Sequence, residues 1–330
     1  MEDKLLVDIM IPVLNEERHI EACISSLQCQ TYGRENFNIM IVDGGSSDET
    51  VSVVKELSRK YQNIKLLQHD KKYAPISLNM AINESRAKYI VRADAHTNYA
   101  YDYVEKCVEH LEMTGADNVG GPMVPVGKSF FQKVVAASYY SIFALGGGKF
   151  HDPEYEGYVD TVYLGAFRRE SLVAAGMYDE GMLKDEDEEL NFRIIKNGGS
   201  VFLTPKIRSY YYPRESLTGL FRQYFDYGYW KVRLIRKHKR PPRITHLVPF
   251  GFVFFLGTGP ALWGVSEYLK HFYIFTLLAY LSLDAVFSIS NRQSDGMLQK
   301  LALMLVHLVL HVSYGLGFAR GIVDFWVLSR

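Results

Sequence analysis

The sequence of 330 residues has few cysteines and no excess charge. Lysine and arginine together number 37, as do aspartate and glutamate, so the net charge gives no indication of a nucleic-acid partner. Cys23, Cys29 and Cys107 show neither paired nor metal-ligand spacing, which is typical of reduced thiols in a cytosolic compartment. The start, Met1-Glu2-Asp3-Lys4, lacks the basic residues and long apolar run of a signal peptide. The fingerprint G-x-G-x-x-G is also absent, which argues against a nicotinamide or flavin site.

Short apolar runs alternate with helical patterns through the first hundred residues. The runs are rich in β-branched residues and predict buried strands at 7–13, 38–42, 64–67 and 89–94. Helices are expected between them, at 15–27, after residue 49 and at 76–84. Ser46 and Glu49 form a capping-box pattern for the second of these helices. This alternation with short links predicts an α/β fold with a mainly parallel, doubly wound sheet.

Acidic side chains follow three of the expected strands. Glu16, Asp43 and Asp94 lie at or just after the strand ends, where ligands bind in such sheets. A helix cap explains Glu16 or Asp43 singly about as well as a ligand does, but three acids at three ends predict a site. Asp94 and His96 could approach one divalent ion from the same side of a turn. Carboxylate oxygen suits Mg²⁺ and Mn²⁺, and imidazole shifts the preference toward Mn²⁺. The alternative is a surface turn that caps the next helix.

A run of five acids, Asp185 to Glu189, precedes a helical pattern that ends at Gly198-Gly199. Such a run is self-repelling unless cations, hydrogen-bond donors or helix geometry compensate. The run is compatible with an acidic helix start that faces water, because the helix dipole favours negative charge there. It is also compatible with a carboxylate held at a cleft as a general base toward a hydroxyl.

Four motifs occur in the order seen in family 2 glycosyltransferases, which the chain resembles. They are Pro12-Val13-Leu14-Asn15-Glu16, Asp43-Gly44-Gly45-Ser46-Ser47-Asp48, Asp94-Ala95-His96 and Glu186-Asp187. The resemblance covers roughly residues 7–230. Within the family it is strongest to the bacterial succinoglycan-type exopolysaccharide glucosyltransferases, through the stretches 159–169, 187–191 and 222–230. It implies the GT-A fold, a Rossmann-like nucleotide-sugar domain, and a nucleotide-sugar donor.

The resemblance also implies a role for each motif. Asp187, in the Glu186-Asp187 motif, would be the catalytic base of an inverting transfer to an acceptor hydroxyl. Asp94 and His96 would hold Mg²⁺ or Mn²⁺ against the departing diphosphate, whose charge a cation stabilises. The implied donor-binding residues are Glu16 at the ribose, Asp43 at the uracil, Pro12, Asn79, Asp94, Gln223 and Trp230. The last two resemble a Gln-x-x-Arg-Trp element, but with longer spacing and no arginine directly before Trp230.

The composition changes near Pro241-Pro242. Three apolar stretches follow, at 247–265, 272–289 and 301–318, and crossing a bilayer takes about 20 apolar residues. Asp284, His307 and His311 are costly in lipid and should face protein or a cavity. We therefore expect a catalytic domain over 1–240, with a nucleotide-sugar half (1–125) and an acceptor half (126–240), and transmembrane helices over 241–330.

A basic stretch directly precedes the first apolar stretch. Residues 231–243 contain seven lysines or arginines and no acid. The positive-inside rule places this end, and the catalytic domain before it, in the cytoplasm against anionic lipid. We expect a multi-pass protein of the cell membrane.

These observations predict an inverting glycosyltransferase that moves glucose or a similar hexose from a UDP-sugar to a hydroxyl. The expected acceptor is a lipid-linked saccharide or polysaccharide in extracellular or cell-surface polysaccharide synthesis. One alternative is a polyprenyl-phosphate sugar transferase, whose ionised acceptor needs no base. A second is an inactive membrane-tethered sugar-binding protein, against which the intact Asp94, His96 and Asp187 argue. No nucleic-acid partner is expected.

Overall fold

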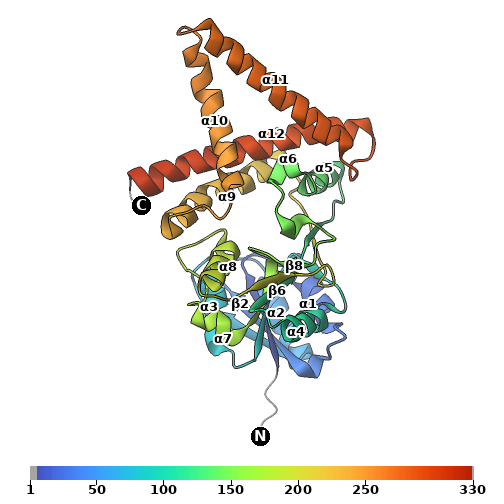
Figure 1. The fold of residues 1–330 in the computed structure, drawn as a ribbon. Helices are drawn as coiled ribbons and strands as arrows, with labels where there is room; N and C mark the ends of the chain where they lie inside the picture. The colour runs from blue at the N-terminus through green and yellow to red at the C-terminus, as the bar shows by residue number, and fades with distance from the viewer. Residues whose placement is uncertain (1–5, 329–330) are drawn as a thin grey trace. The chain divides into compact units, whose positions relative to one another are not determined.

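The computed structural model describes residues 6–328, which form two units (Figure 1). The first unit comprises 6–124 and 149–211, and the second comprises 125–148 and 212–328. Each unit has hydrophobic clusters of its own. The residues of each unit contact one another more than they contact the other unit. The functional division at residues 125 and 240 stays a prediction.

The first unit is built on an eight-stranded sheet of order β3-β2-β1-β4-β9-β6-β10-β8. The strands are β1 (Val7–Val13), β2 (Phe37–Asp43), β3 (Ile64–Gln68), β4 (Tyr89–Arg92), β6 (Asn118–Gly121), β8 (Gly157–Tyr158), β9 (Tyr163–Arg168) and β10 (Val201–Leu203). The first four strands of this order are parallel, whereas β9 is antiparallel to both β4 and β6. β10 is parallel to β6 and antiparallel to β8. The predicted α/β fold with a mainly parallel sheet is confirmed.

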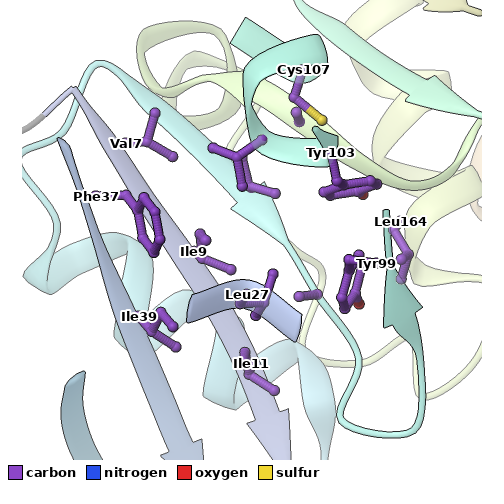
Figure 2. Packing of buried hydrophobic residues seen from close by; sticks show 14 of the residues in the cluster. Val7, Ile9, Ile11, Leu27, Phe37, Ile39, Tyr99, Tyr103, Cys107 and Leu164 are labelled. Carbon is purple, nitrogen blue, oxygen red and sulfur yellow. The ribbon is translucent and has the colours of Figure 1, made fainter. Parts of the chain in front are cut away.

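Helices on both faces bury this sheet. They are α1 (Ile20–Gln28), α2 (Thr50–Lys60), α3 (Ala74–Glu84), α4 (Tyr103–Thr114), α7 (Arg169–Ala174) and α8 (Glu186–Lys196). Alternate side chains of β1 enter two different clusters, Ile9 and Ile11 on one face and Met10 on the other. Figure 2 shows Ile9 and Ile11 beside Ile39 of β2 and Leu27 of α1. Burial on both faces explains why the strands are apolar throughout rather than alternating.

One predicted helix start and one predicted helix cap are wrong. Helix α1 begins at Ile20 and not near Asn15, because Asn15 adopts a left-handed conformation with φ of 58°. Ser46 and Glu49 do not form a capping box for α2. The Ser46 hydroxyl instead accepts the Asn15 backbone N–H (2.9 Å), and Asp48 accepts the backbone N–H of Thr50 (3.1 Å). Ser46 therefore bonds to Asn15, about thirty residues away, and does not cap α2.

A smaller sheet has the order β5-β11-β7. Its strands are β5 (Asn98–Tyr99), β7 (Met123–Pro125) and β11 (Ser209–Tyr211), with β5 and β11 antiparallel. Single 3₁₀ turns occur at Arg34–Asn36 and Lys149–His151. β5 follows the Asp94–His96 turn directly, so this sheet supports the end of that turn. The backbone N–H of Asp94 donates to the Tyr99 hydroxyl (2.7 Å).

The second unit is helical. It contains α5 (Phe130–Tyr139), α6 (Ile142–Leu145), α9 (Leu217–His238), α10 (Val248–Thr258), α11 (Glu267–Ser290) and α12 (Gly296–Gly321), with 3₁₀ turns at Ile244–Leu247 and Gly259–Leu262 and a π-helical end at Ile322–Val327. Helix α12 runs beside α9 (Figure 1). A Cβ at Gly317 would lie 1.9 Å from the carbonyl oxygen of Phe225 in α9, so this close approach requires glycine.

Three helical stretches of this unit are long and apolar enough to cross a membrane. They are Ile244–Leu262, Glu267–Ser290 and Gly296–Val327, and they overlap the three stretches predicted from the sequence. Asp284, His307 and His311 within them face protein, as predicted. His307 Nδ1 lies 2.7 Å from the buried Asp284 carboxylate, and His311 Nε2 donates to the Phe143 carbonyl (2.9 Å).

Candidate active site

The loops after β1 and β2 are bound to each other at the carboxyl end of the sheet. The backbone N–H of Ser47 donates to the Asn15 side chain (2.8 Å), and that of Glu16 donates to the Thr50 hydroxyl (2.8 Å). The backbone N–H of Glu49 donates to the Glu17 carboxylate (3.0 Å). These bonds fix the loop that carries Glu16 against the loop that follows Asp43.

Three of the predicted donor-binding residues lie in the elements of the first unit, with Asp43 at the end of β2, Asn79 in α3 and Pro12 in β1. Asp43 is buried, and its carboxylate accepts the backbone N–H groups of Gly45 (3.1 Å) and Ser46 (3.2 Å). The Asn79 side chain bonds to the backbone N–H and carbonyl of Tyr178, both at 2.9 Å. Pro12 pairs with Val42 in the register of β1 and β2. Asp43 and Asn79 therefore order the backbone around the site, and contact of all three with a donor stays a prediction.

Arg92 is the centre of an acidic cluster that the sequence reasoning missed. It ends β4, is 6% exposed, and its guanidinium contacts three carboxylates. Nη1 donates to Asp187, and Nη2 donates to Glu186 (3.0 Å) and Asp94 (3.5 Å). The available signal was an arginine in an otherwise apolar strand, because a buried cation requires acidic partners. Asp94 and the Glu186-Asp187 motif are thus brought together, as the predicted site requires.

The acidic run begins α8, as predicted, and its members divide between two roles. Glu189 is fully buried and pairs with Arg193 through Nε (2.9 Å) and Nη2 (2.7 Å). Arg193 also donates to the carbonyls of Ala175 and Met177, so this pair fixes α8 to the preceding loop. Glu186 and Asp187 instead point to Arg92. The run is therefore not a helix start that merely faces water.

The electrostatics of this cluster shift the pKa of Asp187 toward neutrality. Burial raises the pKa of Asp187 to about 7, Arg92 opposes that rise, and Glu186 and Asp94 add to it. Burial by itself would lower the pKa of Arg92, but the three carboxylates hold it well above its usual value. Arg92 therefore remains charged at neutral pH. A carboxylate that titrates near neutrality can accept a proton there and later release it.

The two predicted metal ligands lie on one turn but have separate partners. Asp94 contacts Arg92, whereas His96 Nδ1 lies 3.3 Å from a carboxylate oxygen of Glu16. The other Glu16 oxygen lies 3.1 Å from His19 Nδ1. Within residues 6–328, no group of three or more histidine, cysteine, aspartate or glutamate side chains is arranged to hold a metal. Metal binding by Asp94 and His96 stays a prediction.

Gln223 and Trp230 lie on α9, in the second unit. Gln223 Nε2 donates to the Tyr227 hydroxyl (3.0 Å). The centroid of the Trp230 ring lies 5.9 Å from the centroid of the Phe325 ring and 5.6 Å from the guanidinium carbon of Arg233. Both residues take part in the packing of their own unit, and donor binding by either stays a prediction.

Comparison with known proteins identifies the class. The glycosyl transferase family 2 profile matches residues 8–172, half of the chain. The succinoglycan biosynthesis protein ExoA of Rhizobium meliloti (strain 1021) is 32% identical over 324 residues, which cover 96% of this chain and 95% of that protein. The chain therefore belongs to glycosyl transferase family 2 and is a glycosyltransferase.

Further similarities extend over nearly the whole chain. A Methanococcus voltae dolichyl N-acetyl-α-D-glucosaminyl phosphate 3-β-D-2,3-diacetamido-2,3-dideoxy-β-D-glucuronosyltransferase is 27% identical over 96% of this chain and 97% of that protein. The Pyrobaculum calidifontis mannosyltransferase PcManGT was solved with GDP-Man and Mn²⁺. Its structural alignment covers 98% of this chain and 88% of that chain, with 19% identity and a TM-score of 0.61. S. aureus TarS 1-349 with UDP covers 98% and 92%, with 12% identity and a TM-score of 0.51. These structures confirm the predicted GT-A fold.

Proposed function

We propose that the protein is an inverting glycosyltransferase that moves a hexose from a UDP-sugar to an acceptor hydroxyl, with Asp187 as general base. The observation that carries this proposal is the joint position of Asp187, Glu186 and Asp94 around Arg92 at the carboxyl end of β4. Ligands of open α/β sheets bind at that end. The Asp187 side chain is 22% exposed, so it remains accessible to an acceptor.

The chemistry needs one proton acceptor and one stabilised leaving group. The acceptor oxygen forms a bond to the anomeric carbon as the bond from that carbon to the UDP oxygen breaks. Asp187 takes the proton that the hydroxyl loses, which avoids a high-energy oxonium ion. A divalent cation, when bound, would neutralise the diphosphate. Asp94 and His96 are the residues proposed to hold it, because they offer oxygen and nitrogen ligands on one turn.

The nature of the donor and metal is supported by fold-level analogy. TarS was solved with UDP, and PcManGT with GDP-Man and Mn²⁺. UDP is proposed here because Glu16 and Asp43 match the positions that the family uses at the ribose and uracil. Mn²⁺ or Mg²⁺ is proposed because the ligands available are carboxylate and imidazole.

The acceptor is proposed to be a lipid-linked saccharide or growing polysaccharide at the cell membrane. ExoA is named for succinoglycan biosynthesis, and the name of the Methanococcus relative includes a dolichyl-linked sugar phosphate. Three helices able to cross a membrane would bring the enzyme to such an acceptor. The seven basic residues within 231–243 favour a multi-pass protein with its catalytic unit in the cytoplasm.

The test is a donor panel with purified full-length protein in detergent. UDP-linked hexoses and GDP-mannose are each incubated with Mn²⁺ and a membrane lipid extract, and nucleotide release and product mass are measured. The expected result is UDP release with a product one hexose heavier than its acceptor. Selective turnover of GDP-mannose would correct the donor. Absence of any product with all donors would contradict the proposal.

A further inference from the structure

The proposed reaction assigns no part to Arg92, although this residue contacts all three acids of the site. β4 lies between β1 and β9 in the sheet, where Arg92 pairs with Met10 of β1 and the preceding Val91 pairs with Ala166 of β9. The Tyr178 ring lies 5.8 Å from its guanidinium. Its contacts reach a turn at Asp94 and the first turn of α8, which are more than ninety residues apart in sequence. Arg92 is therefore the link between the turn that carries Asp94 and the helix that carries Glu186 and Asp187.

A planar guanidinium suits this position better than an ammonium would. Its nitrogens diverge, so Nη1 can bond to Asp187 while Nη2 bonds to Glu186 and Asp94. Of these contacts the one to Asp94 is the longest, at 3.5 Å, compared with 3.0 Å to Glu186. Asp94 is thus the acid that Arg92 holds least closely, and it is also the proposed metal ligand.

We propose that Arg92 is a positioning residue that acts as the resident cation of the site before the donor binds. It holds Asp187 and Glu186 in place for proton transfer, and it competes with a divalent cation for Asp94. If Asp94 held a cation instead, Arg92 would still have Asp187 and Glu186 as partners. This inference rests on the proposed function. It adds that a divalent cation binds less tightly in the absence of donor, because the cation competes with Arg92 for Asp94.

Removal of the positive charge should therefore strengthen binding of the bare metal. Full-length Arg92→Gln, Arg92→Lys and wild-type protein in detergent are titrated with Mn²⁺ without nucleotide, and free Mn²⁺ is followed by electron paramagnetic resonance. Arg92→Gln is expected to bind Mn²⁺ about tenfold more tightly, because three carboxylates lose a neighbouring cation. Arg92→Lys keeps the charge and is expected to stay within about threefold of wild type.

The kinetic arm separates positioning from folding. In Arg92→Gln, kcat should fall about 10²-fold or more while the donor KM changes less than about threefold, because Asp187 loses its fixed orientation and donor contacts remain. Arg92→Lys should recover part of that loss. The matched control is Arg168→Gln in β9. Arg168 donates to the carbonyls of Ala116 and Leu111 and contacts none of the three acids, so neither kcat nor Mn²⁺ affinity should change.

The outcomes are distinct. Unchanged or weaker Mn²⁺ binding by folded Arg92→Gln overturns the inference, as does normal kcat. Absence of Mn²⁺ binding by both proteins overturns it as well. If wild type releases no UDP from any donor, the proposed function fails, yet tighter Mn²⁺ binding by Arg92→Gln still supports Arg92 as the competing cation. If Arg92→Gln shows no cooperative unfolding transition and is therefore not folded, Arg92→Lys tests the inference in its place. A kcat of Arg92→Lys equal to that of wild type would then refute the positioning role.

Discussion

Replacement of Asp187 by asparagine tests the central chemical claim. The two side chains have nearly the same shape, and the remaining oxygen of asparagine can still accept a bond from Arg92 Nη1. An amide cannot take a proton from the acceptor, however. Loss of general-base catalysis costs about 10²–10⁴-fold in rate. At about 1.36 kcal/mol per factor of ten, this corresponds to about 2.7–5.4 kcal/mol of transition-state stabilisation.

The assay is steady-state UDP release with an accepted donor, together with UDP binding by calorimetry. We expect kcat to fall within that range while UDP-sugar affinity stays nearly unchanged, because Asp187 contacts no predicted donor-binding residue except through Arg92. Glu188→Gln is the matched control, since it makes the same chemical change in the same helical turn, and it should retain near-normal turnover. Near-normal turnover in Asp187→Asn would refute the role of Asp187 as base, because asparagine serves almost as well as aspartate in a helix-start position.

The remaining predictions concern the metal, the pH and the membrane. Asp94→Ala, or exhaustive chelation of wild type, should abolish UDP release, and full turnover after chelation would contradict the metal proposal. His96→Asp should keep activity and shift the preference from Mn²⁺ toward Mg²⁺, measured as the ratio of rates with the two ions, because oxygen replaces nitrogen. Since burial raises the pKa of Asp187 to about 7 and the base must be ionised, kcat/KM should fall about tenfold per pH unit below pH 7 and level off above it. A rate that is constant down to pH 5 would exclude such a base. Full-length protein should stay with membranes through carbonate washing because of its three apolar helices, whereas recovery in the supernatant would show that these helices are ordinary core.

The sequence by itself determined the elements and the residues available for chemistry. The strands of the parallel part were predicted to within a few residues, because burial on both faces makes each a continuous apolar run, as in Val7–Val13. The three apolar helices were also predicted, since length and hydropathy are properties of a single segment. Asp94 and Asp187 were selected because the family's motifs keep their order and local context along the chain.

Tertiary structure decided the contacts between those segments. Asn15 bonds to Ser46, and this distant bond removed both the early start of α1 and the capping box of α2. The pair of Glu189 and Arg193 is local, because the two residues lie four apart on α8. Glu186 and Asp187, in contrast, meet Arg92 only in the folded chain, because Arg92 lies on β4. Helical periodicity therefore supplies the partner of Glu189 but not that of Glu186 and Asp187.

Arg92 shows most clearly which contacts could not be predicted from the sequence. Its distance along the chain from Glu186 is 94 residues, and no local pattern links an arginine in a strand to acids in a helix. The physical reason for the pairing is the cost of burying charge. Burial of the guanidinium at the end of β4 is tolerated because the two carboxylates at the start of α8 lie beside it and offset its loss of hydration. The sequence supplied the acids and the proposed metal ligands, and the fold brought Arg92 of β4 to the acids at the start of α8.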